Sequence, residues 1–311
     1  MPELPEVALY VGALERRLVG QPLEGLRIRS PSLLRTFDPP ASALVGRTVR
    51  AVGRLQKRIV LEFEPSAAEE PLFAVVHLMI TGRFQWQKPG ATVPRKTGHA
   101  AFDFADGSLL LTEQATRKRA SLHVVQGAAA LAEFHRGGVE PLEASLAEFA
   151  EALRRENRTL KRALTDPRLV SGVGNAHSDE ILLGARLSPV QLTQNLSDAE
   201  VERLYQETRD SLTRWTTLLR EEWGDRFPTK VTAFHPEMVA HGKYGQPCPQ
   251  CGSPIQRIRY ADRETNYCPT CQTGGKLLAD RALSRLLGKD WPRTLEEMEE
   301  HIEQRSGRKP E

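Results

Sequence analysis

The chain has 311 residues, of which 40% are hydrophobic and 6% aromatic, and its formal net charge is +3. This length suits two domains with a small appendage, and the longest apolar runs are too short to span a membrane. The acidic N-terminus lacks the apolar region of a signal peptide, so we expect a cytoplasmic protein without membrane association. The small positive charge permits an anionic partner but does not require one.

The first seven residues, Met1 to Val7, place a proline and two acids at the start of a predicted helix. Pro5 suits a first helical turn, and Gly20 predicts the end of the helix. We therefore predict an amphipathic helix directly at the start of the chain. Its apolar face consists of Val7, Val11, Leu14 and Leu18.

Removal of Met1 would make the secondary amine of Pro2 the chain terminus. An α-amino group titrates near pH 8, and the positive end of a helix disfavours its protonated form. Such an amine can attack a sugar C1′ to give a cationic iminium, which makes the neighbouring C2′ proton acidic. The alternative is an ordinary helix start, in which Glu3 and Glu6 only complement the helix dipole.

Many short apolar segments follow between about Leu23 and Val125, and turn residues separate them. This pattern predicts a β-sandwich or barrel, and Asp106-Gly107 indicates a hairpin turn. Lys57 lies between two predicted strands, where a plain surface lysine is the alternative to a functional one. The predicted strands are Leu26–Arg29, Thr48–Val52, Ile59–Phe63, one or two within Leu72–Trp86, Ala101–Phe104, Ser108–Leu111 and Ser121–Val125.

The composition changes near Arg136 to Pro141, which we interpret as a linker, and the pattern beyond it is helical. The turn from Val170 to Asn175 contains two glycines, and Asn175 is a suitable N-cap for the next helix. Amides at such a helix start can bind a phosphate, although a plain helix–helix connection fits equally well. The predicted helices comprise Leu146–Leu153, Leu160–Leu164, Glu180–Leu183 and Ala199–Trp223.

All four cysteines lie in two Cys-x-x-Cys pairs, which are Cys248 with Cys251 and Cys268 with Cys271. In a cytoplasmic chain this spacing predicts one tetrahedral structural zinc ion, and an isolated pair of disulfides is the alternative. The residues between the pairs favour a β-hairpin. Because four thiolates fill the coordination sphere, this zinc would hold structure and take no part in chemistry. The hairpin would run from Ile255 to Tyr267, with Arg257, Arg259 and Arg263 projecting.

This order of features resembles the formamidopyrimidine-DNA glycosylase and endonuclease VIII (Fpg/Nei) family of DNA base-excision repair enzymes. The resemblance covers about residues 1 to 272 and is most specific at Pro2 to Val7, at Leu169 to Asn175 and at the four cysteines with Arg263 between them. It implies an α+β multidomain fold. The expected parts are an N-terminal β-sandwich with a leading helix (1–135), a helix-two-turn-helix domain (136–245), a zinc finger (246–272) and a C-terminal extension of unknown role (273–311).

The resemblance also implies a bifunctional DNA glycosylase and abasic-site (AP) lyase, which removes oxidised bases and nicks the strand by β/δ-elimination. Its partner would be double-stranded DNA that contains damaged bases or abasic sites, and its cofactor one structural Zn²⁺ ion. We expect a monomer that associates with the nucleoid of a bacterium. The alternative from another class is a non-catalytic zinc-finger protein that binds damaged DNA.

Each site residue takes its expected role from the family motif position that it matches. Pro2 would be the nucleophile, Glu3 the general acid/base and Glu6 a support for the site. Lys57 would contact a phosphate and assist catalysis. Further contacts with the DNA backbone would come from Lys161, Gly174, Asn175 and Arg263.

Three departures from the family pattern concern lesion recognition. Ile80 stands where formamidopyrimidine glycosylases have a methionine that fills the gap left by the flipped base, and Met79 is one residue early. Thr116 to Ala120 replaces an Arg-Arg-Phe-Gly loop and has no aromatic residue. Trp223 to Val239 does not match the loop that recognises 8-oxoguanine. We therefore expect a lesion preference that differs from that of a typical 8-oxoguanine enzyme.

Overall fold

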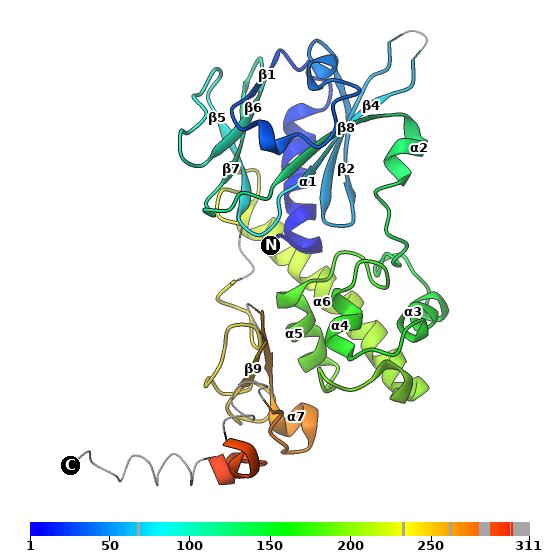
Figure 1. The fold of residues 1–311 in the computed structure, drawn as a ribbon, viewed down its shortest axis with the longest axis vertical. Helices are drawn as coiled ribbons and strands as arrows, with labels where there is room; N and C mark the ends of the chain where they lie inside the picture. The colour runs from blue at the N-terminus through cyan, green and yellow to red at the C-terminus, as the bar shows by residue number, and fades with distance from the viewer. Residues whose placement is uncertain (67–68, 232–233, 261–262, 280–286, 299, 301–311) are drawn as a thin grey trace, which may run out of the picture. The chain divides into compact units, whose positions relative to one another are not determined.

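A computed structural model describes the chain except for residues 67–68, 232–233, 261–262, 280–286, 299 and 301–311 (Figure 1). The chain divides into two compact units, one of Met1–Gly138 with Leu212–Ala233 and the other of Val139–Ser211 with Phe234–Glu311. The long helix α6 (Asp198–Trp223) contributes residues to both units. In the described part of the chain, no helix has the length and apolarity needed to cross a membrane.

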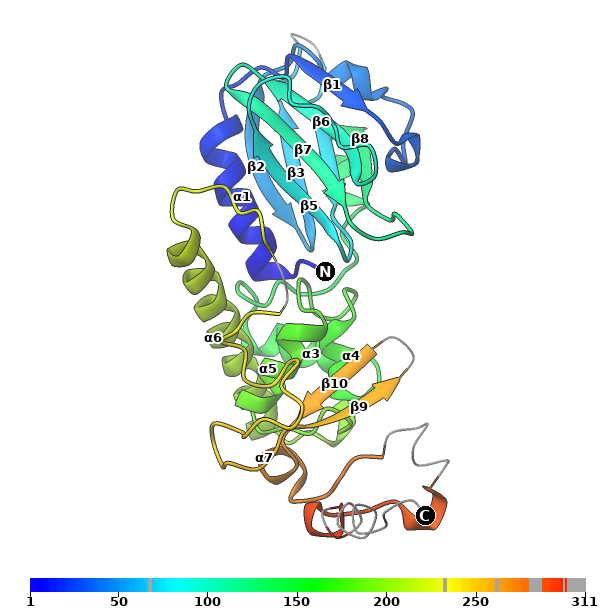
Figure 2. The same cartoon turned by 90° about the vertical axis from the view of Figure 1, so that its left-hand side faces the viewer.

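The first unit contains a leading helix, α1 (Leu4–Leu18), and two four-stranded antiparallel sheets. One sheet has the order β1-β6-β7-β5 and the other the order β2-β3-β4-β8, and Figure 2 shows them stacked beside α1. The predicted β-sandwich is confirmed. Its strands are β1 (Gly25–Ile28), β2 (Val49–Leu55), β3 (Arg58–Phe63), β4 (Leu72–His77), β5 (Gly82–Gln87), β6 (Gly98–Phe104), β7 (Gly107–Glu113) and β8 (Ser121–Gln126).

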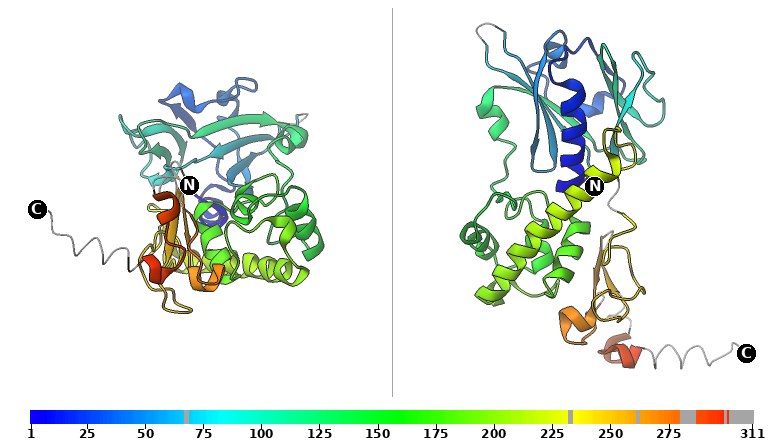
Figure 3. Two further views of the ribbon diagram at one scale, coloured as in Figure 1. Left: turned by 60° about the horizontal axis from the view of Figure 1, so that its bottom comes forward. Right: turned by 180° about the vertical axis from the view of Figure 1, so that it is seen from behind.

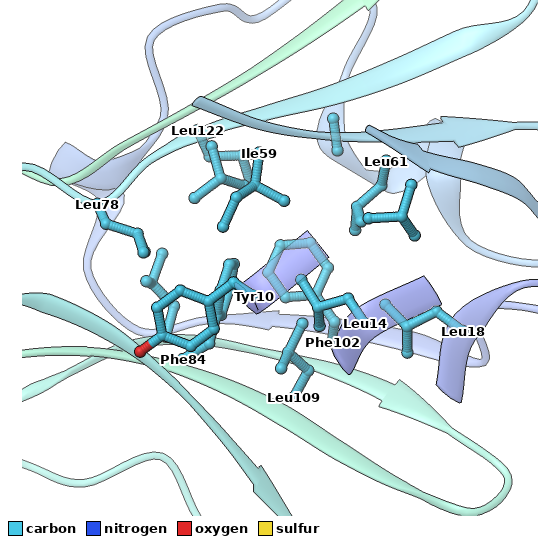
Figure 4. Close-up of a cluster of buried hydrophobic side chains, with 14 of the residues drawn as sticks. Tyr10, Leu14, Leu18, Ile59, Leu61, Leu78, Phe84, Phe102, Leu109 and Leu122 are labelled. Atoms are coloured by element: carbon cyan, nitrogen blue, oxygen red, sulfur yellow. The ribbon is translucent and has the colours of Figure 1, made fainter. Parts of the chain in front are cut away.

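The apolar face of α1 closes the core of this unit. Tyr10, Leu14 and Leu18 are fully buried among side chains from both sheets (Figure 4). In β3, the alternate residues Ile59 and Leu61 point to the same core, as the period of two in a strand requires. Burying one such side chain contributes about 2 kcal/mol. The helix that carries the amino terminus is therefore fixed to the sandwich along its length.

The hairpin between β6 and β7 differs by one residue from the predicted turn. Phe104 pairs with Gly107, so Ala105 and Asp106 form the turn and Gly107 already belongs to the strand. A side chain at Gly107 would place its Cβ 2.5 Å from the ring of Trp86. The glycine is therefore needed for close packing against β5, whereas the sequence pattern suggested a role in the turn.

The second unit contains short helices and the four-cysteine hairpin, which Figure 3 shows in gold with the following helix in orange. The helices confirm the predicted pattern, although α5 begins at Asn175 with Gly174 as its N-cap, so the expectation that Asn175 is the cap is wrong by one residue. The elements are α3 (Leu146–Arg154), α4 (Leu160–Thr165), α5 (Asn175–Gly184), β9 (Gln256–Tyr260), β10 (Arg263–Tyr267) and α7 (Pro269–Thr273).

Further short helices occur among the described residues. The helix α2 (Gly127–Ala132) follows β8 in the first unit. Four 3₁₀ helices join other elements, at Pro31–Leu33, Ala41–Leu44, Thr193–Asn195 and Gly288–Asp290.

Candidate active site and zinc cluster

The amino terminus leads directly into the first turn of α1, beside two buried acids. The backbone amide of Glu3, the N-cap residue, donates a 2.7 Å hydrogen bond to Glu6 Oε2. Glu3 and Glu6 are each 2% exposed, and Pro2 is buried as well. Pro5 occupies the first turn as predicted, where the helix needs no amide from it. The cap therefore fixes the backbone next to Pro2.

Charged side chains surround the amino terminus. Burial lowers the pKa of the Met1 α-amino group below its ordinary value of 8.0. The charges of Glu3 and Glu6 oppose this shift, whereas those of Arg83 and Lys57 add to it. All four side chains therefore contribute to the electrostatic environment of the terminus. The net effect favours the neutral form of the Met1 α-amino group.

Lys57 reaches this site from a tight turn between β2 and β3. Leu55 pairs with Arg58 across the hairpin, so Gln56 and Lys57 form a two-residue turn. Gln56 adopts a φ of 57°, in the left-handed region that such turns use. The half-buried Lys57 side chain is thus presented at the end of a sheet, close to the amino terminus.

Arg83 is a site residue that sequence reasoning missed. It lies in β5 and is half-buried, and its Nη1 donates to the carbonyl oxygens of Gly82 (2.6 Å) and Ile80 (3.3 Å). Burial lowers the pKa of the Arg83 guanidinium, and Tyr10 and Glu6 partly offset that effect. In the sequence, Gly-Arg-Phe resembles any strand start, and only the folded chain brings this cation to the terminus.

The loop before β5 presents Ile80 to solvent. Ile80 is 51% exposed, whereas Met79 is half-buried and has a φ of 55°. His77 Nδ1 accepts a 2.9 Å hydrogen bond from the Met79 amide, and burial lowers the pKa of His77 to about 4. A Cβ on Gly82 would lie 2.1 Å from the Leu78 carbonyl oxygen, so the tight loop requires glycine there.

A buried carboxylate holds the basic loop that follows β7. Glu113 is 2% exposed, and its Oε2 accepts hydrogen bonds from the amides of Arg119 (2.9 Å) and Ala120 (3.1 Å). His99 Nε2 lies 2.9 Å from the same oxygen. Arg117 and Arg119 are exposed. Glu113 therefore anchors the end of the loop from Thr116 to Ala120, which presents positive charge.

In the second unit, three of the four predicted DNA-binding residues, Lys161, Gly174 and Asn175, meet at the start of α5. Lys161 Nζ donates to the Asn175 carbonyl oxygen at 2.9 Å and also pairs with the carboxylate of Asp179. Asn175 Nδ2 donates to the Glu264 carbonyl oxygen in β10 at 3.0 Å. Lys161 is only 9% exposed, so its contacts favour a role in holding Asn175. Gly174 is the N-cap of the same helix.

The four cysteines converge as the sequence spacing predicts. Their sulfur atoms all lie within 4.8 Å of one another, with 3.4 Å between Cys251 and Cys268 and 4.0 Å between Cys248 and Cys271. Tetrahedral zinc at about 2.3 Å from each sulfur separates the sulfurs by about 3.8 Å, so the cluster fits this ion. Arg263 begins β10 and pairs with Tyr260 across the hairpin that joins the two pairs.

Three family models match successive parts of the chain. The formamidopyrimidine-DNA glycosylase N-terminal domain matches residues 1–121, and the formamidopyrimidine-DNA glycosylase H2TH domain matches residues 138–217. The zinc finger found in FPG and IleRS matches residues 245–274, which contain all four cysteines.

Relatives and solved structures agree with these matches. Formamidopyrimidine-DNA glycosylases of Heliobacterium modesticaldum and Listeria innocua are 33% and 30% identical, and each alignment covers 88% of this chain and 100% of the relative. A Lactococcus lactis FPG mutant in complex with Fapy-dG containing DNA is 27% identical with a TM-score of 0.76, over 88% of this chain and 100% of that one. MutM in complex with DNA that contains carbocyclic 8-oxo-G is 26% identical, with the same TM-score and coverage. The chain belongs to the formamidopyrimidine-DNA glycosylase family.

Proposed function

We propose that this protein is a bifunctional DNA glycosylase and AP lyase of base-excision repair. The observation that carries the proposal is the buried start of α1, where Glu3 and Glu6 lie beside Pro2 and the charges of Lys57 and Arg83 also act on the amino terminus. Relatives are named formamidopyrimidine-DNA glycosylase, and solved structures of family members hold DNA that contains Fapy-dG or an abasic site. Its substrate is thus double-stranded DNA, which in a bacterium associates the protein with the nucleoid.

The first chemical steps replace the damaged base with the protein. After Met1 is removed, the neutral amine of Pro2 attacks C1′, the bond from C1′ to the base breaks, and the departing base takes up a proton from Glu3. The Pro2 nitrogen then loses its proton to Glu3. Glu3 gives a proton to the sugar ring oxygen as the bond from C1′ to that oxygen breaks, which leaves a cationic iminium between Pro2 and C1′.

The iminium allows strand cleavage. It draws electrons from C2′, so a base removes a C2′ proton and the electron pair expels the 3′ phosphate. Lys57 neutralises charge on a phosphate near the reacting sugar. Water finally adds to C1′, and Pro2 leaves as a free amine. Glu6 contributes by holding the Glu3 backbone through the 2.7 Å hydrogen bond.

The second unit supplies contacts with the DNA backbone. Asn175 and the Gly174 cap lie at the start of α5, where the helix dipole favours a phosphate. Arg263 contacts a further phosphate from the hairpin, and Lys161 contributes by holding the Asn175 carbonyl. Such contacts fix the backbone while the damaged base leaves the stack, which costs a few kcal/mol.

We also infer that the protein binds one structural zinc ion. Cys248, Cys251, Cys268 and Cys271 are the ligands, and the ion supplies rigidity to a hairpin too small to fold alone. With four protein ligands the ion has no open position for substrate.

Single-turnover base release tests the proposed reaction. Wild-type protein should excise formamidopyrimidine from a duplex and nick the strand. Glu3→Gln should bind the same duplex but release base at least a hundredfold more slowly, which is the usual contribution of a general acid/base. Glu24→Gln, a change at an exposed residue in the same unit, is the matched control. Wild-type rates from Glu3→Gln would refute the assigned chemistry.

A further inference from the structure

Asp179, in α5, is a fully buried acid that the proposed reaction does not use. Its two carboxylate oxygens have different partners. Oδ1 accepts from Lys161 Nζ, and Oδ2 lies 2.8 Å from His241 Nδ1. A buried carboxylate is costly unless it is paired, so these contacts are strongly constrained. Asp179 therefore connects α4, α5 and the segment that leads to the zinc finger.

The contact with Lys161 extends to the predicted phosphate site. Lys161 Nζ also donates to the Asn175 carbonyl oxygen at 2.9 Å. The Asp179 charge holds the ammonium in the position from which it bonds this carbonyl. An unpaired ammonium at this depth would instead turn toward water. The backbone at the first residue of α5 thus depends on a carboxylate one turn further along the helix.

Neighbouring groups in α5 fasten this helix to the segment that contains the zinc-finger hairpin. Glu180 Oε1 accepts from the backbone amides of Ala240 (2.8 Å) and His241 (2.9 Å). Asn175 Nδ2 donates to the Glu264 carbonyl oxygen in β10 at 3.0 Å. The two sides of the Asn175 residue, its carbonyl and its amide side chain, are therefore each held by a separate partner.

We propose that Asp179 is a positioning residue for DNA binding: it holds Lys161 against the Asn175 carbonyl and so fixes the phosphate-binding start of α5. This inference rests on the proposed function, because it assumes that Asn175 contacts a DNA phosphate. It assigns Lys161 an indirect role through Asn175.

The test uses the full zinc-loaded chain and a duplex with a stable abasic-site analogue. Asp179→Asn alone leaves the Lys161 ammonium unpaired and lowers the melting temperature, so the informative variant is Asp179→Asn with Lys161→Met. This double variant removes both charges and should melt near wild type with one equivalent of zinc. It should nevertheless bind the duplex about tenfold more weakly, the effect of one lost charged hydrogen bond.

Two further readouts separate positioning from a purely structural role. The slope of affinity against salt should stay near the wild-type value in the double variant, because the lost contact is that of the neutral Asn175 and not a direct contact between the Lys161 ammonium and a phosphate. In the wild-type chain, Asn175→Ala should weaken DNA binding by a similar factor. In the double variant it should weaken DNA binding little further, because both changes remove the same contact.

Different results overturn different claims. A double variant that binds as tightly as wild type, or a further tenfold loss on adding Asn175→Ala, would overturn the role of Asp179 alone. A wild-type chain that does not prefer the abasic duplex over undamaged DNA would overturn the proposed function, and the role of Asp179 with it.

Discussion

The backbone amide of Glu3 donates a 2.7 Å hydrogen bond to the carboxylate of Glu6, one turn further along α1. This bond joins the residue proposed as general acid/base to a buried acid that does not itself need to react. It also fixes the direction in which the chain enters the helix, and thereby the position of Pro2. The geometry of the nucleophile thus depends on an ordinary helix cap.

Replacing Glu6 should therefore affect stability and chemistry together. Glu6→Ala removes the cap acceptor and should lower the free energy of unfolding by about 1 kcal/mol, as for other cap losses. Single-turnover base release should slow more than this stability change explains, because Pro2 and Glu3 lose their fixed positions. Glu15→Ala, at an exposed position of the same helix, is the control. Equal rates for both variants would show that the cap has no catalytic consequence.

Metal analysis should give one tightly bound zinc ion per chain. Cys268→Ser should release it, loosen the hairpin that carries Arg263 and weaken DNA binding. Thr270→Ala changes an exposed residue between two ligands and should keep the metal. Native protein that contains no zinc after metal-free handling would contradict the assignment.

Acid should destabilise the protein partly through His77. Burial, with the nearby charges of Arg58 and Lys57, lowers the pKa of His77 to about 4. Histidine in an unfolded chain titrates near 6.5, so the unfolded state binds the proton first as pH falls. The neutral His77 therefore supports stability fully above about pH 6.5, and this support is lost as pH falls towards 4.

The measurement is the free energy of unfolding at pH 7 and pH 4.5. Between these pH values the free energy of unfolding of wild type should fall by on the order of 2 kcal/mol more than that of His77→Gln, because glutamine does not titrate. His135→Gln, at an exposed histidine, should keep the wild-type pH dependence. Parallel losses in wild type and His77→Gln would show that His77 does not carry this effect.

Lesion choice should differ from that of a typical 8-oxoguanine enzyme, because Ile80 is exposed at the tip of its loop and the loop after β7 has no aromatic. Single-turnover cleavage of formamidopyrimidine, oxidised pyrimidine and single-stranded or bubble substrates should compare favourably with cleavage of 8-oxoguanine opposite cytosine. Ile80→Met should raise the rate of cleavage at 8-oxoguanine opposite cytosine relative to the rates for the other substrates. A clear wild-type preference for 8-oxoguanine opposite cytosine would refute this reading of the loops.

The sequence was most informative where a signal is local. Alternating apolar residues predicted the strands, and two Cys-x-x-Cys turns predicted the metal cluster because each pair lies on its own turn. The first seven residues combined a helix start with a proline and two acids. Gly107 was misplaced in a turn because its reason for being glycine, the ring of Trp86, lies on another strand.

Residues that act through distant partners could not be predicted. The Arg83 charge acts on the amino terminus only in the folded chain, where Phe84 of β5 contacts Tyr10 of α1. Glu113 is an unremarkable strand residue in the sequence, and its partner His99 lies 14 positions earlier. Asp179 has partners 18 and 62 positions away. In each case the sequence has the residue, but the contact that gives it a role is created by folding.

The central claim is that Pro2 forms a covalent iminium with C1′ of a damaged or abasic nucleotide. Borohydride reduces such an intermediate to a stable amine, so incubation with abasic duplex and borohydride should cross-link the protein to DNA. Peptide mapping by mass spectrometry should place the cross-link on the N-terminal peptide. In a variant with a bulky residue at position 2, Met1 is retained and the nitrogen of residue 2 is a secondary amide without a nucleophilic lone pair, so borohydride should trap no adduct.

Protein that lacks Met1 should therefore yield an adduct at Pro2 with abasic DNA. If Met1-free protein bound this DNA but gave no adduct with it or with any lesion tested, the enzyme account would be contradicted, and a zinc-finger protein that binds damage without cleaving it would be the better description.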